Sequence, residues 1–274
     1  MQIAEYDNRL LRNENFILQS NTNKGEKDEV RTMQRIFQYN EAKQYSELAN
    51  IFGPDAQEGV SVINPDTGQV YTDMMHIKKV NSQCKADGIF KMLKTSVVYS
   101  CSIKSNACSK HALLNHTPRS AKVFGPTGFL HTHLNHLDVV MKEYIDKRNA
   151  GIFTEDVSMN RLESLQTPMV RESVVIMMMY FMFLGTGKGD SKKEANSILF
   201  YEKDGSVTFV PSLSDEQKKM HVSSILDDCV LSLREKGMPK KIADINHPWT
   251  YHDTKQDGKV VHKGCLHIRG PSSK

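Results

Sequence analysis

Residues 85–104, KADGIFKMLKTSVVYSCSIK, contain two apolar runs separated by a short polar break. The runs, residues 86–93 and 97–103, are rich in the β-branched, aromatic and other apolar side chains that favour strands. The break, residues 94–96, is short enough for a turn between antiparallel strands. The stretch therefore predicts a β-hairpin.

Three polar side chains stand at one end of this predicted hairpin. Asp87 begins the first strand, and Ser102 and Lys104 end the second. Because side chains alternate between the two faces of a strand, Ser102 and Lys104 point the same way, and strand pairing brings Asp87 towards both. A carboxylate, a hydroxyl and an ammonium group that converge there can hold a hard divalent cation and orient an attacking water.

The arrangement resembles the core of PD-(D/E)xK nucleases, and among them the type II restriction endonucleases. Asp87 matches the acid of the family pattern and Lys104 matches its lysine. Ser102 stands where the second acid usually stands, and Ala86 replaces the proline before the first acid. The following run, SIKSNACSKHALLNHTPRSAKVF, extends the likeness through its Ser-x-Lys-Ser and Leu-Leu-Asn segments, so that it covers residues 85–121.

This resemblance implies an α/β fold with a restriction-endonuclease-like core, in which a central mixed β-sheet is flanked by helices. It implies a single nuclease domain with an N-terminal helical part (about 1–55), a catalytic core (about 56–150) and a C-terminal DNA-contacting part (about 151–274). The implied activity is Mg²⁺-dependent hydrolysis of double-stranded DNA at a specific short sequence by a cytoplasmic homodimer. Ser102 in place of an acid keeps a catalytically weak or inactive DNA-binding protein open, and a DNA repair nuclease is a third interpretation.

The resemblance also implies roles for the residues of the hairpin. Asp87 ligates Mg²⁺, and the backbone carbonyl of Ile103 is a further candidate ligand. Lys104 activates the attacking water and stabilises the charge that builds on the phosphorane. Ser102 orients the water or completes the ligand shell.

In the resembled family a helix before the core often supplies an extra acid to the site. Residues 26–52 have the apolar spacing of a helix, which contains three candidate acids, Glu29, Glu41 and Glu47. A solvated surface charge is the alternative interpretation of each. We select Glu47 as the additional catalytic acid.

Two segments supply candidate DNA contacts after the core. Ser105, Asn115 and Arg119 lie in or beside polar turns, and we expect Arg119 to contact phosphate or guanine. The alternative is a structural loop closed by Asn115. The tail predicts a second hairpin around residues 256–258. It forms a further candidate DNA-facing element, with Trp249, Tyr251, Lys255 and Lys259.

The Gly-rich segment GTGKGDSKKEAN, residues 185–196, lacks the GxxxxGK[ST] spacing of a nucleotide-binding loop. We expect its Lys188, Lys192 and Lys193 to contact phosphates and Asn196 to read adenine. A solvated loop before a strand hairpin is the competing interpretation.

The composition of the chain only loosely limits its possible partners and cellular compartment. A net charge of +4 and a pI near 8.7 are compatible with nucleic-acid binding without requiring it. The five cysteines form no CxxC pair, which favours reduced thiols in a cytoplasm. The start has early charges and no apolar core of a signal peptide, so we expect none. The apolar run 174–184 is shorter than the roughly 20 residues that span a bilayer, so we expect no membrane partner.

The remaining pattern predicts further helices and strands. The predicted helices are residues 131–149, 157–165, 168–184 and 214–236, and the predicted strands are residues 197–201 and 206–210. His131, His133 and His136 invite a zinc interpretation, but no Cys-rich partner motif follows them.

Overall fold

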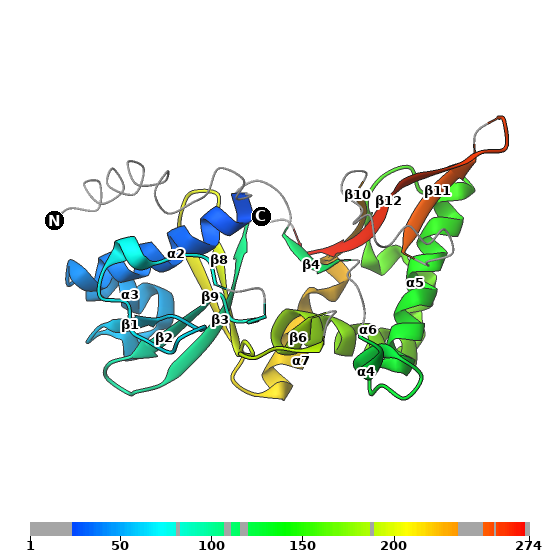
Figure 1. Cartoon of the computed structure of the whole chain (residues 1–274). Coiled ribbons are helices and arrows are strands. Elements are labelled where there is room, and N and C mark those ends of the chain that lie inside the picture. The colour runs from blue at the N-terminus through cyan, green and yellow to red at the C-terminus, as the bar shows by residue number, and fades with distance from the viewer. Residues whose placement is uncertain are drawn as a thin grey trace. The chain divides into compact units, whose positions relative to one another are not determined.

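The computed structural model describes residues 24–80, 83–106, 111–115, 120–186, 189–234, 249–254 and 256–271. The chain forms two compact units, shown in Figure 1. The first unit contains residues 1–109 and 191–217, and the second contains residues 110–190 and 218–274. These boundaries cross the three sequential parts predicted from the sequence, because residues 191–217 belong with the N-terminal unit.

The first unit has a five-stranded mixed sheet, as the α/β prediction requires. Its strands, in spatial order, are β1 (Val60–Ile63), β2 (Gly88–Met92), β3 (Val98–Ser105), β8 (Ser197–Tyr201) and β9 (Val207–Pro211). Strands β3 and β8 run parallel, and the other neighbours are antiparallel. The chain leaves β3, passes through the first part of the second unit and returns as β8.

The predicted hairpin is confirmed. Gly88 of β2 pairs with Cys101 of β3, and Lys91 pairs with Val98. The turn between them contains Ser96, whose φ of 60° is rare for a residue with a side chain. The predicted pair of strands at 197–201 and 206–210 is also confirmed, as β8 and β9.

Helix α2 (Lys24–Glu41) packs against β1, β3 and β8, and it covers one face of the sheet in Figure 1. Met33 and Ile36 of this helix are fully buried against Phe90 and Ile103 of the sheet in one apolar core. This burial is the main physical reason why the helix and the sheet stay together. The short turns η1 (Pro54–Ala56) and η2 (Met74–His76) complete the unit.

The prediction of a single helix over residues 26–52 is wrong in one respect. Helix α2 ends at Glu41, and a separate helix α3 covers Tyr45–Phe52. Lys43 between them has a φ of 55°, a left-handed conformation that a continuous α-helix cannot contain. Gly53, with a φ of 85°, ends α3 and is followed by Pro54.

The second unit is built on an antiparallel sheet. Its strands, in spatial order, are β11 (Thr250–Thr254), β12 (Val260–Arg269), β10 (Val230–Arg234) and β5 (Val157–Ser158), with β4 (Ala112–Asn115) also paired to β12. The hairpin of β11 and β12 confirms the predicted pair of strands around residues 256–258. Two short strands, β6 (Gly185–Thr186) and β7 (Gly189–Asp190), pair separately.

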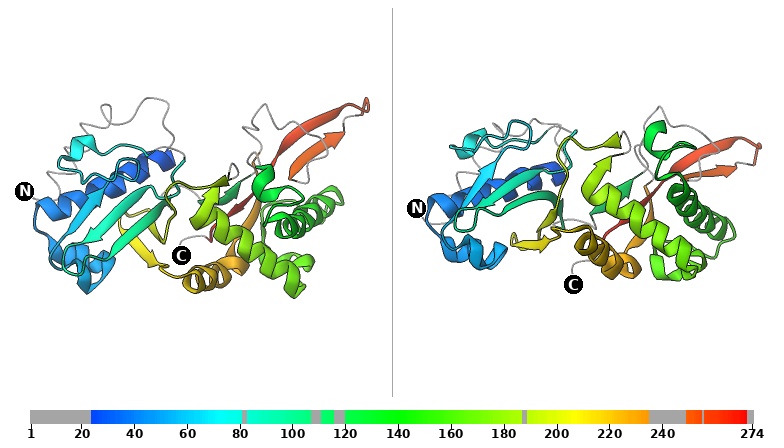
Figure 2. Two further views of the ribbon diagram at one scale, coloured as in Figure 1. Left: turned by 60° about the horizontal axis from the view of Figure 1, so that its bottom comes forward. Right: turned by 90° about the horizontal axis from the view of Figure 1, so that it is seen from below.

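Helices α5 (His131–Asn149) and α6 (Pro168–Met179) pack side by side in this unit, as Figure 2 shows. Helix α5 has the predicted bounds, and α6 continues into a π-helical turn, η5 (Tyr180–Leu184), so the predicted helix 168–184 is confirmed with a widened last turn. The remaining helical elements are α4 (Ala121–Phe124), η3 (Met159–Arg161), η4 (Glu163–Gln166), α7 (Asp215–Ile225) and η6 (Leu226–Asp228).

Two helix predictions fail in part. Residues 157–165 form the short strand β5 and two 3₁₀ turns instead of a helix. The helix predicted at 214–236 ends at Ile225, and its second half is strand β10. Strand β10 lies between β12 and β5, and its adjacent residues Leu231 and Ser232 are both buried. Pairing on both sides thus overrides the local helical pattern.

Trp249 is fully buried, and its indole Nε1 donates a 2.6 Å hydrogen bond to Asp138 of α5. The prediction that Trp249 faces DNA is therefore wrong.

Four cysteines are free thiols, as expected: Cys84, Cys101, Cys229 and Cys265. Cys108 lies outside the described residues. Among the described helices, none combines the length and the apolar character that a bilayer crossing requires.

Candidate active site

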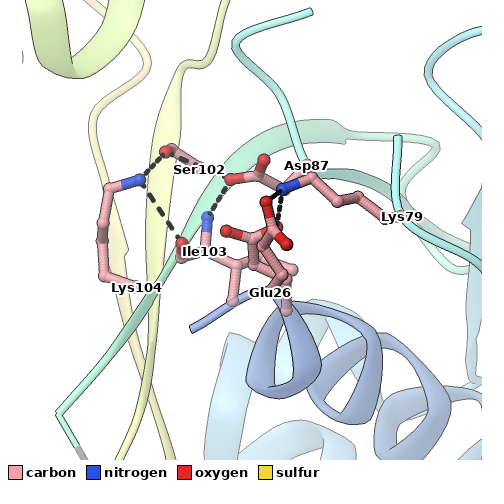
Figure 3. A network of polar contacts seen from close by, with 7 residues as sticks. Glu26, Lys79, Asp87, Ser102, Ile103 and Lys104 are labelled. Atoms are coloured by element: carbon pink, nitrogen blue, oxygen red, sulfur yellow. Dashed lines mark hydrogen bonds and ion pairs between the residues drawn. The ribbon is translucent and has the colours of Figure 1, made fainter. Parts of the chain in front are cut away.

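Asp87 lies immediately before β2, and its backbone N–H donates a 2.8 Å hydrogen bond to the carbonyl of Cys101. This bond extends the β2–β3 pairing by one residue and places Asp87 beside Ser102. The carboxylate Oδ2 of Asp87 accepts hydrogen bonds from the Ile103 backbone N–H at 2.8 Å and from the Ser102 hydroxyl at 3.3 Å (Figure 3). The hairpin register thus fixes the orientation of the carboxylate.

Lys104 reaches back along its own strand to the same group of atoms. Its Nζ donates to Ser102 Oγ at 2.7 Å and to the Ile103 carbonyl at 3.3 Å (Figure 3). Ser102 is 1% exposed. Its hydroxyl therefore accepts a hydrogen bond from Lys104 and donates one to Asp87. The predicted convergence of Asp87, Ser102 and Lys104 at one end of the sheet is present in the structure.

A carboxylate of α2 belongs to this group, and it is Glu29. Burial and the neighbouring Asp87 carboxylate raise the pKa of Glu29 from 4.5 to about 8, against the opposing effect of Lys104 and Lys79. Lys79 Nζ lies 3.9 Å from Glu29 Oε2 and also forms an ion pair with Glu26 (Figure 3). Glu29 is thus in electrostatic contact with both Asp87 and Lys104.

Glu47, the acid selected from the sequence, lies in the first turn of α3, and this helix packs against α2, η1 and β9. Within the part of the chain that the structure describes, no interaction joins Glu47 to Asp87. The helical spacing of the buried residues of α2 indicates Glu29 instead. Glu29 precedes the buried Met33 by four residues and the buried Ile36 by seven, so it lies on the sheet-facing side of α2.

Lys85 is a second residue that the sequence interpretation missed. Burial lowers its pKa to about 7, with a further contribution from Lys104, while Asp87 and Glu29 act in the opposite direction. Three carboxylates and three lysines thus influence one another at this end of the sheet: Glu26, Glu29, Asp87, Lys79, Lys85 and Lys104.

Two predicted DNA-contacting side chains make hydrogen bonds within the first unit. The hydroxyl of Ser105 donates to the buried carboxylate of Asp28. The side-chain amide of Asn196 accepts from the Ser100 backbone N–H at 2.8 Å and donates to the Val98 carbonyl at 3.3 Å. The amide of Asn196 therefore fastens the start of β8 to β3.

The other predicted DNA contacts are distributed over several segments. Lys192 and Lys193 are exposed on the loop before β8. The backbone of Asn115 pairs with His267 within the sheet of the second unit. Three of the predicted contacts lie outside the described residues: Arg119, Lys188 and Lys255.

The three histidines at the start of α5 have partners within the second unit. His131 Nδ1 lies 3.0 Å from the Phe124 carbonyl oxygen. His133 Nδ1 and His136 Nδ1 lie 3.1 Å and 2.7 Å from the hydroxyl of the buried Ser173. Across the described ranges, no group of three or more His, Cys, Asp or Glu side chains is placed to hold a metal ion.

The oxygen atoms near Asp87 nevertheless suit Mg²⁺. This ion is commonly held by only one or two carboxylates, with waters and substrate phosphates completing its octahedral shell. Asp87 and Glu29 offer two mutually repelling carboxylates, and Ile103 offers a carbonyl oxygen beside them. A cation between the carboxylates relieves their repulsion.

Comparisons with protein-family models, with curated proteins and with solved structures gave no match to this chain.

Proposed function

We propose that this chain is a Mg²⁺-dependent endonuclease that hydrolyses phosphodiester bonds in double-stranded DNA at a specific short sequence, as type II restriction endonucleases do. The observation that carries the proposal is the contact series from Asp87 Oδ2 through Ser102 Oγ to Lys104 Nζ, with separations of 3.3 Å and 2.7 Å. It joins a carboxylate and an ammonium group at one end of the sheet against which α2 packs.

Asp87, Glu29 and the carbonyl of Ile103 are the groups that would hold the metal. When bound, Mg²⁺ polarises a phosphoryl oxygen and makes a coordinated water more acidic. Asp87 is oriented for this task by the Ile103 N–H, which occupies only its Oδ2 and leaves Oδ1 for a ligand bond.

Lys104 supplies positive charge where negative charge develops during attack on phosphorus. Its ammonium is held by Ser102 and by the Ile103 carbonyl, so it needs little reorganisation in the transition state. Its third N–H is directed to a water or a phosphate oxygen. Ser102 acts through Lys104 and Asp87 and is therefore a positioning residue.

A catalytically silent DNA-binding protein of the same fold is favoured by one observation, which is that Ser102 cannot carry the negative charge of the acid usual at its position. Glu29 of α2 offers a second carboxyl group that interacts with Asp87, and a bound cation would favour its charged form. We therefore prefer the active enzyme.

The test is cleavage of supercoiled plasmid DNA with Mg²⁺ by wild-type protein and by Asp87→Asn and Lys104→Met. Each substitution is expected to lower the cleavage rate about 100-fold or more, because each removes a charge aimed at the reacting group. Duplex binding, measured with Ca²⁺ in place of Mg²⁺, should persist.

Matched controls are Glu58→Gln and Lys94→Gln, which remove exposed charges from the same unit. Cleavage by Asp87→Asn at the wild-type rate contradicts the proposal. Binding without cleavage by the wild-type protein favours the silent DNA-binding protein. Discrete product bands indicate a restriction activity, whereas graded loss from DNA ends indicates a repair exonuclease.

A further inference from the structure

A cavity of about 470 Å³ lies in the first unit, at the segment that leads into Asp87. Three pieces of chain form it, namely the turn after β1, the segment before β2 and the loop before β8. Its lining residues are Pro65, Asp66, Gln83, Cys84, Lys192 and Lys193. The proposed reaction, as described above, uses none of them.

Backbone hydrogen bonds hold the two longer walls of the cavity together. Lys192 N–H donates to the Gln83 carbonyl at 3.1 Å, and the N–H groups of Lys85 and Ala86 donate to the Lys193 carbonyl at 2.8 Å and 3.1 Å. The loop that carries both lysines is thus fastened to the chain one residue before Asp87.

Ser191 strengthens this connection. Its hydroxyl accepts a hydrogen bond from the Lys85 N–H at 2.6 Å and lies 3.0 Å from the Gln83 carbonyl and 2.9 Å from the Lys193 carbonyl. The backbone of Lys192 and Lys193 is therefore positioned by the segment that directly precedes Asp87 in the chain.

The charge of the cavity is positive. Lys192 and Lys193 are exposed, and neither makes a salt bridge to another residue in the described portion of the chain. Asp66 is the one carboxylate in the lining, and its Oδ1 accepts from the Cys84 thiol at 3.4 Å. Burial and Asp66 raise the pKa of the Cys84 thiol, whereas both lysines lower it.

A DNA strand presents one phosphate for about every 3.4 Å of helix axis. When one phosphate of a strand lies at Asp87 and Lys104, the neighbouring phosphates of that strand therefore lie along the surface next to this site. The cavity offers two lysine side chains on a loop that is hydrogen-bonded to the residues just before Asp87, whereas the Asp87 site itself is rich in carboxylates.

We propose that the cavity lined by Lys192 and Lys193 binds a backbone phosphate of the DNA strand, close to the phosphate that is cleaved. This inference rests on the proposed function. The contact carries no sequence information, and its role is to fix the register of the strand over Asp87.

The test compares the wild-type protein with Lys192→Gln/Lys193→Gln and with a control, Lys91→Gln/Lys94→Gln. The control lysines are also exposed and belong to the same unit, but they lie at the turn end of the β2–β3 hairpin. Affinity for a short fluorescent duplex is measured with Ca²⁺ over a series of salt concentrations. A second series uses duplexes in which one phosphate at a time is replaced by an uncharged methylphosphonate.

Loss of one phosphate contact lowers the magnitude of the slope of log K against log salt by about 0.9. Between 50 and 200 mM salt, the wild-type affinity should therefore fall about 3.5-fold more than that of the Lys192/Lys193 variant, whereas the control should match the wild type. One methylphosphonate position that weakens wild-type binding should have no effect on this variant.

Suppose that the wild-type protein cleaves DNA and that the Lys192/Lys193 variant keeps the wild-type slope and methylphosphonate pattern. This result overturns the phosphate site and leaves the nuclease proposal intact. If the variant shows the expected change of slope but the wild-type protein never cleaves DNA, the phosphate site is supported and the nuclease proposal is contradicted. Absence of duplex binding by the wild-type protein contradicts both.

Discussion

Lys104 Nζ donates a 2.7 Å hydrogen bond to the hydroxyl of Ser102, on the same face of β3. The same hydroxyl donates to Asp87, so a single oxygen links the two residues on which the proposed chemistry depends. Ser102 thus forms a neutral bridge between the two charged groups. This relationship leads to a first prediction about Ser102.

Ser102→Ala removes the bridge but leaves both charged groups in place. We expect the single-turnover cleavage rate to fall by about 10-fold or more, because a hydrogen bond to a charged group contributes about 1.5–3 kcal/mol. Duplex affinity should stay unchanged. Ser102→Thr keeps the hydroxyl and should recover most of the rate, whereas equal loss in both variants would point to a packing defect.

Glu29→Gln should raise the Mg²⁺ concentration that gives half-maximal cleavage, because it removes a carboxylate next to Asp87. Glu47→Gln is the matched control, since Glu47 lies on α3. The measurement is a Mg²⁺ titration of the plasmid cleavage rate for each variant. A larger effect of Glu47→Gln would restore the acid selected from the sequence.

Glu29→Gln should also stabilise the metal-free protein, and the gain should depend on pH. The pKa of Glu29 is about 8 in the folded chain and near its ordinary 4.5 when unfolded, so the native state holds the extra proton between these values. Wild-type stability therefore falls as pH rises from about 4.5 to about 8.

The free energy of unfolding of Glu29→Gln should exceed that of the wild type by on the order of 2 kcal/mol at pH 8, and by little at pH 4.5. Urea denaturation in EDTA at several pH values measures this difference. A gain that is the same at every pH would show that burial, and not proton linkage, is its cause.

Trp249 is the one tryptophan of the chain, so its fluorescence reports on the second unit. Because Trp249 is fully buried, we expect a blue-shifted emission that added duplex leaves unchanged. Asp138→Ala leaves the indole N–H without its acceptor and should destabilise this unit by about 1–3 kcal/mol in urea unfolding followed by that emission. Strong quenching by DNA would contradict the buried placement.

The features that the sequence predicts well are set by neighbouring residues. The β2–β3 hairpin follows from two apolar runs around a short break, and α5 follows from an apolar stripe of constant spacing. Convergence of Asp87 and Lys104 needs only this hairpin and the alternation of side chains. These predictions therefore required no knowledge of distant contacts.

The features that the sequence misses depend on packing between distant segments. The strand β10 is chosen by pairing with β12 and β5, although its local pattern continues a helix. Glu29, rather than Glu47, interacts electrostatically with Asp87, because α2 lies against the sheet and the chain leaves the helical conformation at Lys43, before Glu47. The altered pKa of Lys85 likewise arises from burial and from charges on three different elements.

The central claim is that Asp87 and Lys104 act together on one phosphodiester. The most direct measurement is the plasmid cleavage rate of Asp87→Asn, Lys104→Met and the double variant at saturating Mg²⁺. Residues that act as a unit give non-additive losses, so the account predicts that the double variant is about as slow as the slower single variant. Single variants that cleave at the wild-type rate, or losses that simply multiply, would contradict it.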